Sequence, residues 1–267
     1  MRYDERIEYN QLKYILLSLL DTFVITMSNH DETPSSASTG ADNGSMSASD
    51  SHPEFKVWED VSEISPDLLR GIYAYGFEKP SNIQQKSIMS IIQGRDVIAQ
   101  AQSGTGKTGA FTVAALQSID VGKAATQIII LAPTRELARQ IYDVIHGLSA
   151  MMCGLHMRLL VGGTSTAEDA AELRKSVPHI IVGCPGRVFD MIRRNHIQSS
   201  QVHMLVLDEA DEMLSAGFND QIYNIFQYMP SEIQVVLFSA TMPTELYNLT
   251  EKFMRNPVNI QVKAEQL

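Results

Sequence analysis

The chain has 267 residues, of which 44% are hydrophobic, so it can bury a substantial core as one large domain or as one domain with tails. Its net charge is −10, but residues 1–65 hold 12 acidic and 4 basic side chains, which leaves 19 acidic and 17 basic in residues 66–267. The folded part is therefore nearly neutral, which excludes a general basic field for nucleic acid and leaves that task to local arginines. Two cysteines without metal-ligand spacing exclude a disulfide framework and predict a reduced intracellular compartment.

Residues 1–53 are predicted to be an N-terminal extension that is largely disordered. Residues 28–52 are rich in Ser, Thr, Asp, Asn and Gly and show no periodicity. Residues 14–27 are mostly apolar, but the run is too short to span a bilayer and contains Asp21, which argues against a signal peptide and a membrane partner. Because Met27 opens the Ser-rich segment, one hypothesis is that residues 1–26 are an upstream extension of the reading frame.

A short strand over residues 96–101 precedes a glycine loop and a helix predicted over 108–118. The glycines of such a loop let successive N–H groups point at phosphate oxygens, and the helix presents its positive end to the same place. The lysine then reaches the β- and γ-phosphates, and the last hydroxyl is placed to bind Mg²⁺. Position 101 is Ala where the strict motif has Gly, and a glycine turn that opens an ordinary helix is the alternative. The predicted loop consists of Ser103, Gly104, Thr105, Gly106, Lys107 and Thr108.

Strands and helices alternate regularly after this loop. Apolar strands are predicted over residues 127–132, 157–161, 179–183, 204–207 and 234–238. Helices are predicted over residues 136–149, 168–175, 188–194, 220–228 and 245–253. This alternation is typical of the α/β class, with one parallel sheet covered by helices on both faces.

Two carboxylates follow the apolar strand at 204–207. Asp208 and Glu209 would lie at the carboxyl end of that strand, where ligands bind in open α/β folds. We expect Asp208 to hold Mg²⁺ and Glu209 to orient the attacking water. The alternative is a solvated acidic loop that begins a helix. With the glycine loop, the pair predicts ATP and Mg²⁺ as cofactors.

Seven motifs occur in the order typical of DEAD-box RNA helicases, and the chain resembles that family from roughly residue 54 onward. The motifs begin at Gly76, Gly104, Pro133, Gly162, Pro185, Asp208 and Ser239. The resemblance implies a RecA-like P-loop NTPase domain over residues 54–267, with a mostly parallel sheet and helices on both faces. The sequence around residues 69–81 and 253–258 resembles the initiation factor 4A branch of the family.

The resemblance also assigns roles to single residues of the nucleotide site. Lys107, Asp208 and Glu209 would be catalytic, and Thr108 and Asp208 would hold the metal. Phe77 would stack on adenine, and Gln84 would bind its exocyclic edge through its amide. The alternative for Gln84 is a capping box with Ser81, a helix N-cap three residues earlier.

Single-stranded RNA is the implied partner, bound through its backbone and so without sequence preference. At the motif that begins at Pro133, the alternative is that Arg135 and Arg139 are solvated or paired with Glu136 and Asp143. Asp211, Ser239 and Thr241 would couple nucleotide state to RNA, although Thr241 could instead be an N-cap ahead of Pro243. Cys184 stands where the family has Thr, which would remove a hydroxyl cap. The implied RNA-binding residues are Pro133, Thr134, Arg135, Gly162, Gly163, Pro185, Gly186 and Arg187.

No His-Arg-x-Gly-Arg string occurs in the sequence, although the family's second RecA-like domain supplies one to the γ-phosphate. The chain is therefore expected to bind ATP and to hydrolyse it very poorly without that domain. The first hypothesis is the ATPase half of an RNA helicase, cytoplasmic or nuclear, with initiation-factor or nuclear scaffold proteins as partners. The alternatives are a naturally truncated, non-catalytic RNA- or scaffold-binding protein and a P-loop ATPase that acts on protein.

Overall fold

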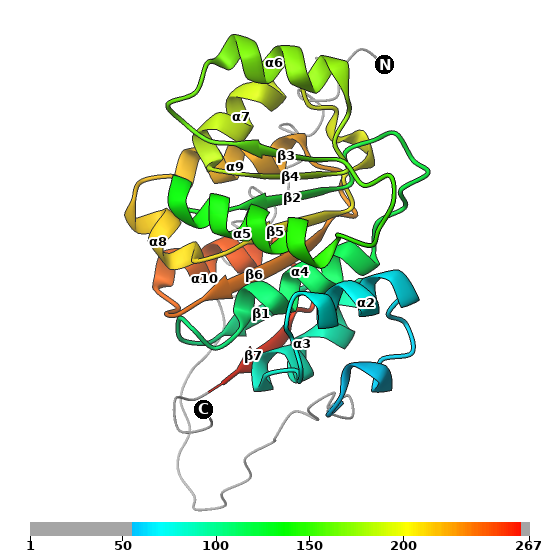
Figure 1. Cartoon of the computed structure of the whole chain (residues 1–267). Helices are drawn as coiled ribbons and strands as arrows, with labels where there is room; N and C mark the ends of the chain where they lie inside the picture. Colours follow the sequence, from blue (N-terminus) through cyan, green and yellow to red (C-terminus); the bar gives the residue numbers. More distant parts are fainter. Residues whose placement is uncertain (1–54, 263–267) are drawn as a thin grey trace, which may run out of the picture. The chain divides into compact units, whose positions relative to one another are not determined.

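The computed structural model describes residues 55–262, and the predictions for residues 1–53 lie outside this range. Seven strands form one sheet in the order β3-β4-β2-β5-β6-β1-β7, and every neighbouring pair whose register is defined is parallel (Figure 1). The predicted α/β class with a parallel sheet is therefore confirmed. None of the helices between residues 55 and 262 combines the length and apolar character that a membrane span needs.

The strands are short, and successive side chains point to opposite faces of the sheet. In β2, for example, Ile128 and Ile130 pack into one buried cluster, while Ile129 and Leu131 pack into the other. Because both faces are covered by helices, β2, β4 and β5 contain no polar side chain. The strands are β1 (Val97–Gln100), β2 (Ile128–Leu131), β3 (Met157–Leu160), β4 (Ile180–Gly183), β5 (Met204–Leu207), β6 (Gln234–Ser239) and β7 (Val258–Gln261).

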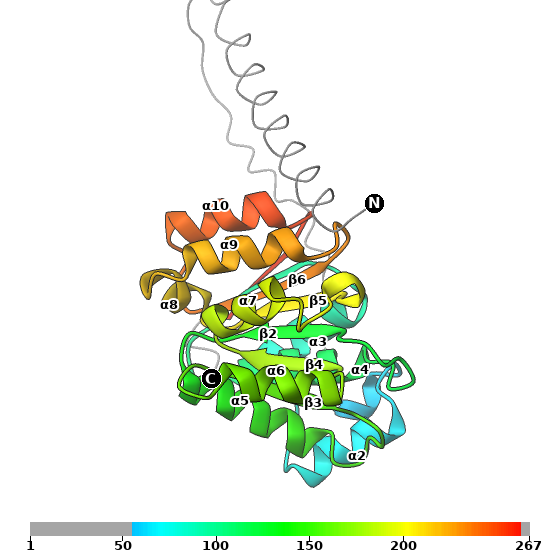
Figure 2. The same cartoon turned by 90° about the horizontal axis from the view of Figure 1, so that it is seen from above.

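The helices divide between the two faces in chain order (Figure 2). One face is covered by α2 (Pro66–Ala74), α3 (Asn82–Ile92), α4 (Lys107–Gln117) and α5 (Arg135–Leu148). The other is covered by α6 (Thr166–Lys175), α7 (Pro185–Arg193), α8 (Ala210–Ser215), α9 (Asn219–Tyr228) and α10 (Thr244–Phe253). Two 3₁₀ turns, η1 (Trp58–Asp60) and η2 (Ser199–Gln201), complete the described elements.

Every strand and helix predicted after residue 95 is present, with ends that differ by no more than a few residues. Elements α2, α3, α8 and β7 are not among the strands and helices predicted from the sequence. Edge strand β7 alternates polar and apolar residues, and only Ile260 on it is buried, so it lacks the apolar run that marks the inner strands. Helix α8 has only six residues, too few to show a helical period.

The order of the strands sorts the motifs into two groups. The carboxyl ends of parallel strands meet at one edge of a sheet, and ligands bind there. Neighbouring strands β5, β6 and β1 end at the acidic motif, at Ser239 and at the glycine loop. Neighbouring strands β3, β4 and β2 end at the three motifs assigned to RNA. Because β2 pairs with β5, the two groups lie side by side.

Candidate functional site

The glycine loop between β1 and α4 has the backbone that a phosphate cradle requires. Gly104 and Gly106 have φ values of 82° and 96°, in the left-handed region that favours glycine. A Cβ atom on Gly106 would lie only 2.6 Å from Ser81 Oγ, so the loop also packs too closely there for a side chain. Thr105 Oγ1 donates to the Gln102 carbonyl at 2.9 Å, and Lys107 is buried at the start of α4. The loop is therefore held open with its lysine at a helix N-terminus.

Gln84 joins helix α3 to this loop. Its Oε1 accepts a 2.8 Å hydrogen bond from the Ser81 backbone N–H, and its Nε2 donates to the Gly106 carbonyl at 3.1 Å. The glutamine half of the predicted capping box is thus present, whereas the Ser81 hydroxyl is buried without a partner among the described residues. A glutamine amide has two N–H donors and two acceptor lone pairs. The bonds to Ser81 and Gly106 therefore leave one donor and one acceptor for adenine, so the two interpretations are compatible.

Phe77 belongs to an aromatic cluster beside the same loop. Its ring lies nearly parallel to Trp58 at a centroid distance of 6.4 Å and edge-on to Tyr75 at 5.1 Å. Trp58 Nε1 donates to the Phe77 carbonyl at 3.0 Å, which fixes this segment. A Cβ atom on Gly109 would lie 2.9 Å from the Phe77 ring and 2.4 Å from Gln84 Nε2. Gly109, which was not predicted as a site residue, thus lets both predicted adenine contacts approach α4.

Asp208 is buried at the end of β5 with 2% of its surface exposed. Burial raises the pKa of this carboxyl to about 7, against the opposing effect of the Lys107 charge. The Glu209 N–H donates to Asp208 Oδ1 at 3.0 Å, but no ion pair of the described residues includes Asp208. A buried carboxylate without a paired cation is expensive, so this site favours binding of a cation.

Glu209 adopts a left-handed backbone, with φ 50° and ψ 51°, which is unusual for a residue with a side chain. Burial, followed by the neighbouring charge of Glu212, raises the pKa of its carboxyl. Strain of this kind costs about 1–3 kcal/mol and persists where the surrounding structure imposes it. The backbone turn directs the chain from β5 into α8 and leaves the Glu209 side chain only partly buried.

The residues present fit Mg²⁺ bound together with phosphate rather than alone. Among residues 55–262, no group of three or more His, Cys, Asp or Glu side chains could hold a metal ion. Mg²⁺ commonly takes one or two protein oxygens and completes its shell with water and substrate phosphates. Asp208, directly after β5, and the partly buried Thr108, in the first turn of α4, carry oxygens of this kind. No metal is expected at this site without a nucleotide.

Asp211, Ser239 and Thr241 form a hydrogen-bonded group between α8 and the end of β6. Asp211 Oδ2 accepts from the Thr241 N–H at 2.9 Å and from its hydroxyl at 2.7 Å, and the Ser239 hydroxyl accepts from the Asp211 N–H at 3.4 Å. Burial favours a higher pKa for Asp211, but the bonds from Thr241 and Ser239 outweigh it and lower the pKa. The N-cap interpretation of Thr241 is wrong, because α10 begins at Thr244 after Pro243.

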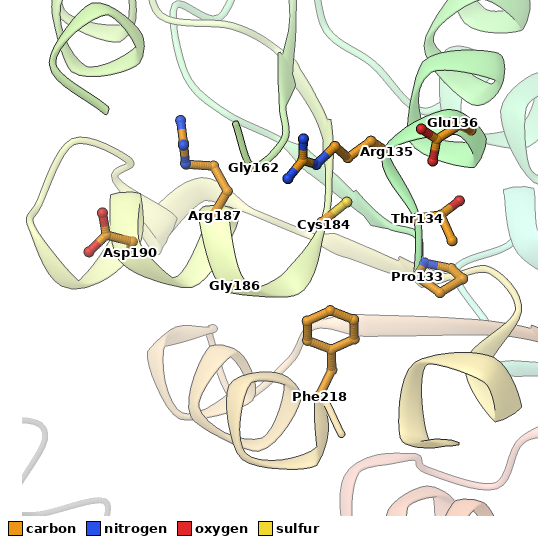
Figure 3. Close-up of a pocket in the computed structure, with 10 residues that line it drawn as sticks. All are labelled: Pro133, Thr134, Arg135, Glu136, Gly162, Cys184, Gly186, Arg187, Asp190 and Phe218. Atoms are coloured by element: carbon orange, nitrogen blue, oxygen red, sulfur yellow. The ribbon is translucent and has the colours of Figure 1, made fainter. Parts of the chain in front are cut away.

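The motifs at the ends of β2, β3 and β4 line one pocket of about 660 Å³ (Figure 3). Gly163 and Pro185 were predicted to bind RNA but do not line it. Glu136 on α5, Asp190 on α7 and Phe218 just before α9 line it and were not predicted, because their positions depend on how the elements pack. The lining residues are Pro133, Thr134, Arg135, Glu136, Gly162, Cys184, Gly186, Arg187, Asp190 and Phe218.

The two predicted arginines of this pocket lie in different environments. Arg135 is exposed, and none of the ion pairs among the described residues includes it, so the solvated alternative fits better than the paired one. Figure 3 shows its side chain reaching toward Gly162. Arg187, in contrast, forms an ion pair with Asp169, and its side chain is only 9% exposed. Its Nη2 also donates to the Thr164 carbonyl at 2.8 Å.

Helix N-termini at the pocket are capped unequally. The Thr134 hydroxyl accepts from the Leu137 N–H at 3.1 Å and so caps α5. Cys184 is the N-cap of α7 and makes no side-chain cap bond. Burial raises the pKa of the Cys184 thiol, against the effect of the Arg135 charge, so the thiolate form is scarce at neutral pH. The sequence-based expectation of a missing cap at Cys184 is confirmed.

A model of the family described as "DEAD/DEAH box helicase" matches residues 81–249. The chain is 55% identical over 208 residues to "Eukaryotic initiation factor 4A-3" of Arabidopsis thaliana, which covers 78% of this chain and 50% of that protein. It is also 55% identical over 208 residues to "ATP-dependent RNA helicase eIF4A" of Aspergillus clavatus, covering 78% of this chain and 52% of that protein. The chain spans about half the length of the curated relatives it matches.

Solved structures give the same result. A DEAD box protein from the hyperthermophile Methanococcus jannaschii superposes with a TM-score of 0.75 and 34% identity, covering 79% of this chain and 57% of that one. Dbp5 of S. cerevisiae bound to Gle1 and IP6 superposes with a TM-score of 0.72 and 33% identity, covering 80% of this chain and 54% of that one. In both, this chain corresponds to little more than half of the solved protein.

Proposed function

Because the chain belongs to the DEAD/DEAH box helicase family, we propose that residues 55–262 are the nucleotide-binding domain of an ATP-dependent RNA helicase. The observation that supports this most is the sheet order. It brings the ends of β5, β6 and β1 together, which supports a site for Mg-ATP there, and it brings the ends of β3, β4 and β2 together beside them, which supports a site for RNA. Nucleotide and RNA would then bind to the same edge of one sheet.

In the proposed nucleotide site, the N–H groups of residues 103–108 and the Lys107 ammonium bind the phosphates. Asp208 and Thr108 hold Mg²⁺, which would neutralise charge on the β- and γ-phosphates and stabilise the buried Asp208 carboxylate. Glu209 orients the attacking water. The remaining donor and acceptor of Gln84 bind the adenine edge, and Phe77 packs against the ring.

In the proposed RNA site, the pocket residues bind the sugar-phosphate backbone of a single strand. Arg135 supplies the exposed positive charge, and the N-termini of α5 and α7 supply oriented N–H donors. Such contacts do not read base edges, so binding is independent of sequence. Asp211, Ser239 and Thr241 connect the two sites, since α8 follows the metal-binding carboxylate directly and precedes Phe218 of the pocket.

Efficient hydrolysis and unwinding require groups from outside residues 55–262. An arginine finger accelerates phosphoryl transfer in NTPases by several orders of magnitude, about 10³–10⁵-fold. We propose that a second RecA-like domain supplies it, as the half-length match to the relatives allows. Initiation-factor or nuclear scaffold proteins are the proposed partners, and the cytoplasm, or else the nucleus, is the proposed compartment.

The proposal is tested by titrating the purified chain with a fluorescent ATP analogue and with a labelled single-stranded oligouridine. We expect Mg²⁺-dependent nucleotide binding, competed by ATP more strongly than by GTP because of Gln84. RNA anisotropy should rise at low salt and more so with nucleotide bound. An equal loss of signal with ATP and GTP would contradict the adenine assignment, and no RNA binding at low salt would contradict the RNA site.

A further inference from the structure

Two charged side chains beside the RNA pocket are buried against each other. Asp169 lies on α6 and Arg187 on α7, and their side chains are 6% and 9% exposed. Charged residues are almost never buried unless they are paired, and a buried pair is stable only when further hydrogen bonds satisfy both groups. These two meet that condition.

The hydrogen bonds of this pair converge on Thr164. Arg187 Nη1 donates to the Thr164 hydroxyl at 2.9 Å, and Nη2 donates to the Thr164 carbonyl at 2.8 Å. The Thr164 hydroxyl in turn donates to Asp169 Oδ2 at 3.2 Å, and Arg158 Nη2 donates to Oδ1 at 3.4 Å. The planar guanidinium fork of Arg187 is therefore used inside the protein.

Thr164 ends the turn against which the exposed arginine of the pocket packs. Gly163, just before it, has a φ of 87°, and a Cβ atom there would lie 2.4 Å from Arg135 Nη1. Contacts thus run from Asp169 through Arg187 and Thr164 to Gly163 and Arg135. Movement of Arg187 would break its two bonds to Thr164, the residue that ends the turn beside the Arg135 guanidinium.

We propose that Asp169 and Arg187 are positioning residues for RNA, and that Arg135, not Arg187, neutralises the phosphate. The inference rests on the proposed RNA site and assigns its charges. The Asp169 carboxylate cancels the Arg187 charge, so one uncompensated cation remains among the arginines that line the pocket. The pair fixes the spacing between the turn at 162–164 and the N-terminus of α7.

The opposing hypothesis is a latch. RNA would displace Asp169, and Arg187 would swing out to contact a phosphate itself. The two hypotheses differ in the number of phosphates neutralised, which the salt dependence of binding measures. For single strands, log K falls against log salt concentration with a slope of about −0.7 for each phosphate neutralised.

The test is the salt dependence of oligouridine binding by the whole chain and its variants. Arg135→Gln should make the slope shallower by about 0.7. Arg187→Gln should weaken binding about three- to tenfold at each salt concentration and leave the slope unchanged, because it removes support and no phosphate contact. A slope that becomes shallower by about 0.7 in Arg187→Gln overturns the proposal.

Arg187→Lys keeps a positive charge near Asp169 but removes the planar guanidinium group, so it tests whether the charge or the hydrogen-bonding geometry matters. A lysine ammonium cannot reproduce the fork to Thr164 and Asp169, so we expect this variant to bind RNA as weakly as Arg187→Gln. Affinity close to that of the unmodified chain would favour direct phosphate binding and contradict the proposal. Arg174→Gln, which alters an exposed arginine on α6, is the matched control and should change neither quantity.

Asp169→Asn gives opposite signs for the two hypotheses. A latch predicts tighter RNA binding when the carboxylate charge is removed, whereas positioning predicts weaker binding. The double variant Asp169→Asn/Arg187→Gln should bind no more weakly than the weaker single variant, because both changes remove one support. Thermal melting and ATP-analogue binding are measured in parallel to show that each variant is folded. If the unmodified chain fails to bind oligouridine, the proposed RNA function fails as well; any other failure concerns only this assignment.

Discussion

One half of the sheet edge lies at the ends of β5, β6 and β1, and the other at the ends of β3, β4 and β2. The two halves differ in whether a buried carboxyl group has an ion-pair partner. At the ends of β5 and β1, Asp208 is buried without an ion pair and its pKa is raised to about 7. At the ends of β3 and β4, Asp169 is equally buried but is paired with Arg187 and bonded to Thr164. In the first half no side chain of the described residues pairs with the buried carboxyl, whereas in the second the buried pair is satisfied within the protein, and Arg135 is the exposed arginine among those that line the pocket. A buried carboxyl group without a partner therefore marks the site where chemistry is expected, and a buried ion pair marks the structure that supports the neighbouring site.

The largest effect is expected from removing the ammonium group of Lys107, which lies in the same half as Asp208. Lys107→Ala should weaken binding of the fluorescent ATP analogue by at least about 100-fold, because a charge-assisted contact to phosphate is lost at a helix N-terminus. Lys175→Ala, which changes an exposed lysine at the end of α6, is the control and should bind normally. Unchanged binding by Lys107→Ala would show that the glycine loop alone holds the phosphates.

A second prediction compares the two buried aspartates directly in urea unfolding without nucleotide. Asp169→Asn should lower the free energy of unfolding by about 3 kcal/mol, because Arg187 loses its buried partner. Asp208→Asn should raise it by about 1–3 kcal/mol, because an unpaired buried carboxyl is replaced by a neutral amide of similar shape. Asp208→Asn should also lose the Mg²⁺ dependence of nucleotide binding. If both variants changed the free energy of unfolding in the same direction, the proposed difference between the two aspartates would be wrong.

A third prediction concerns the pH dependence of stability, which we expect to come from a buried histidine beside β4. His179 is buried at the start of β4, and its Nδ1 accepts from the His156 N–H at 2.9 Å. Burial, and then the charge of His156, lowers the pKa of His179 below its ordinary value near 6.5. The unfolded chain thus binds a proton more readily than the folded one, so stability is full above pH 6.5 and falls as pH drops below it.

The free energy of unfolding should fall by at most about 1.4 kcal/mol per pH unit for each such histidine as the pH drops below 6.5. His179→Asn keeps an acceptor for the His156 N–H and should make the dependence shallower. Part of it should remain, because burial also lowers the pKa of His203. Urea unfolding at several pH values measures this, and an unchanged pH dependence in His179→Asn would assign the effect to other groups.

Much of this organisation could be predicted from the sequence, but contacts between residues that lie far apart in the chain could not. The motifs predicted the glycine loop, the strand before Asp208 and the Cys184 cap position, because each depends on neighbours in the chain. The pairing of Arg187 could not be predicted, since its partner Asp169 lies 18 residues away on another helix. The order of the strands was equally hidden, because short apolar strands such as β2, β4 and β5 carry no mark of their neighbours.

The smallest effect is expected at the N-terminus of α7, which has no side-chain cap. Cys184→Thr would place a hydroxyl at the N-cap of α7, where it can accept a backbone N–H as Thr134 does on α5. We expect the free energy of unfolding to rise by about 0.5–1 kcal/mol, measured by urea unfolding. Cys184→Val, which has nearly the shape of Thr without the hydroxyl, is the control. RNA affinity should rise modestly in Cys184→Thr alone, because a capped first turn holds the N–H donors of α7 in place beside the phosphate, and an equal gain in Cys184→Val would assign the effect to packing.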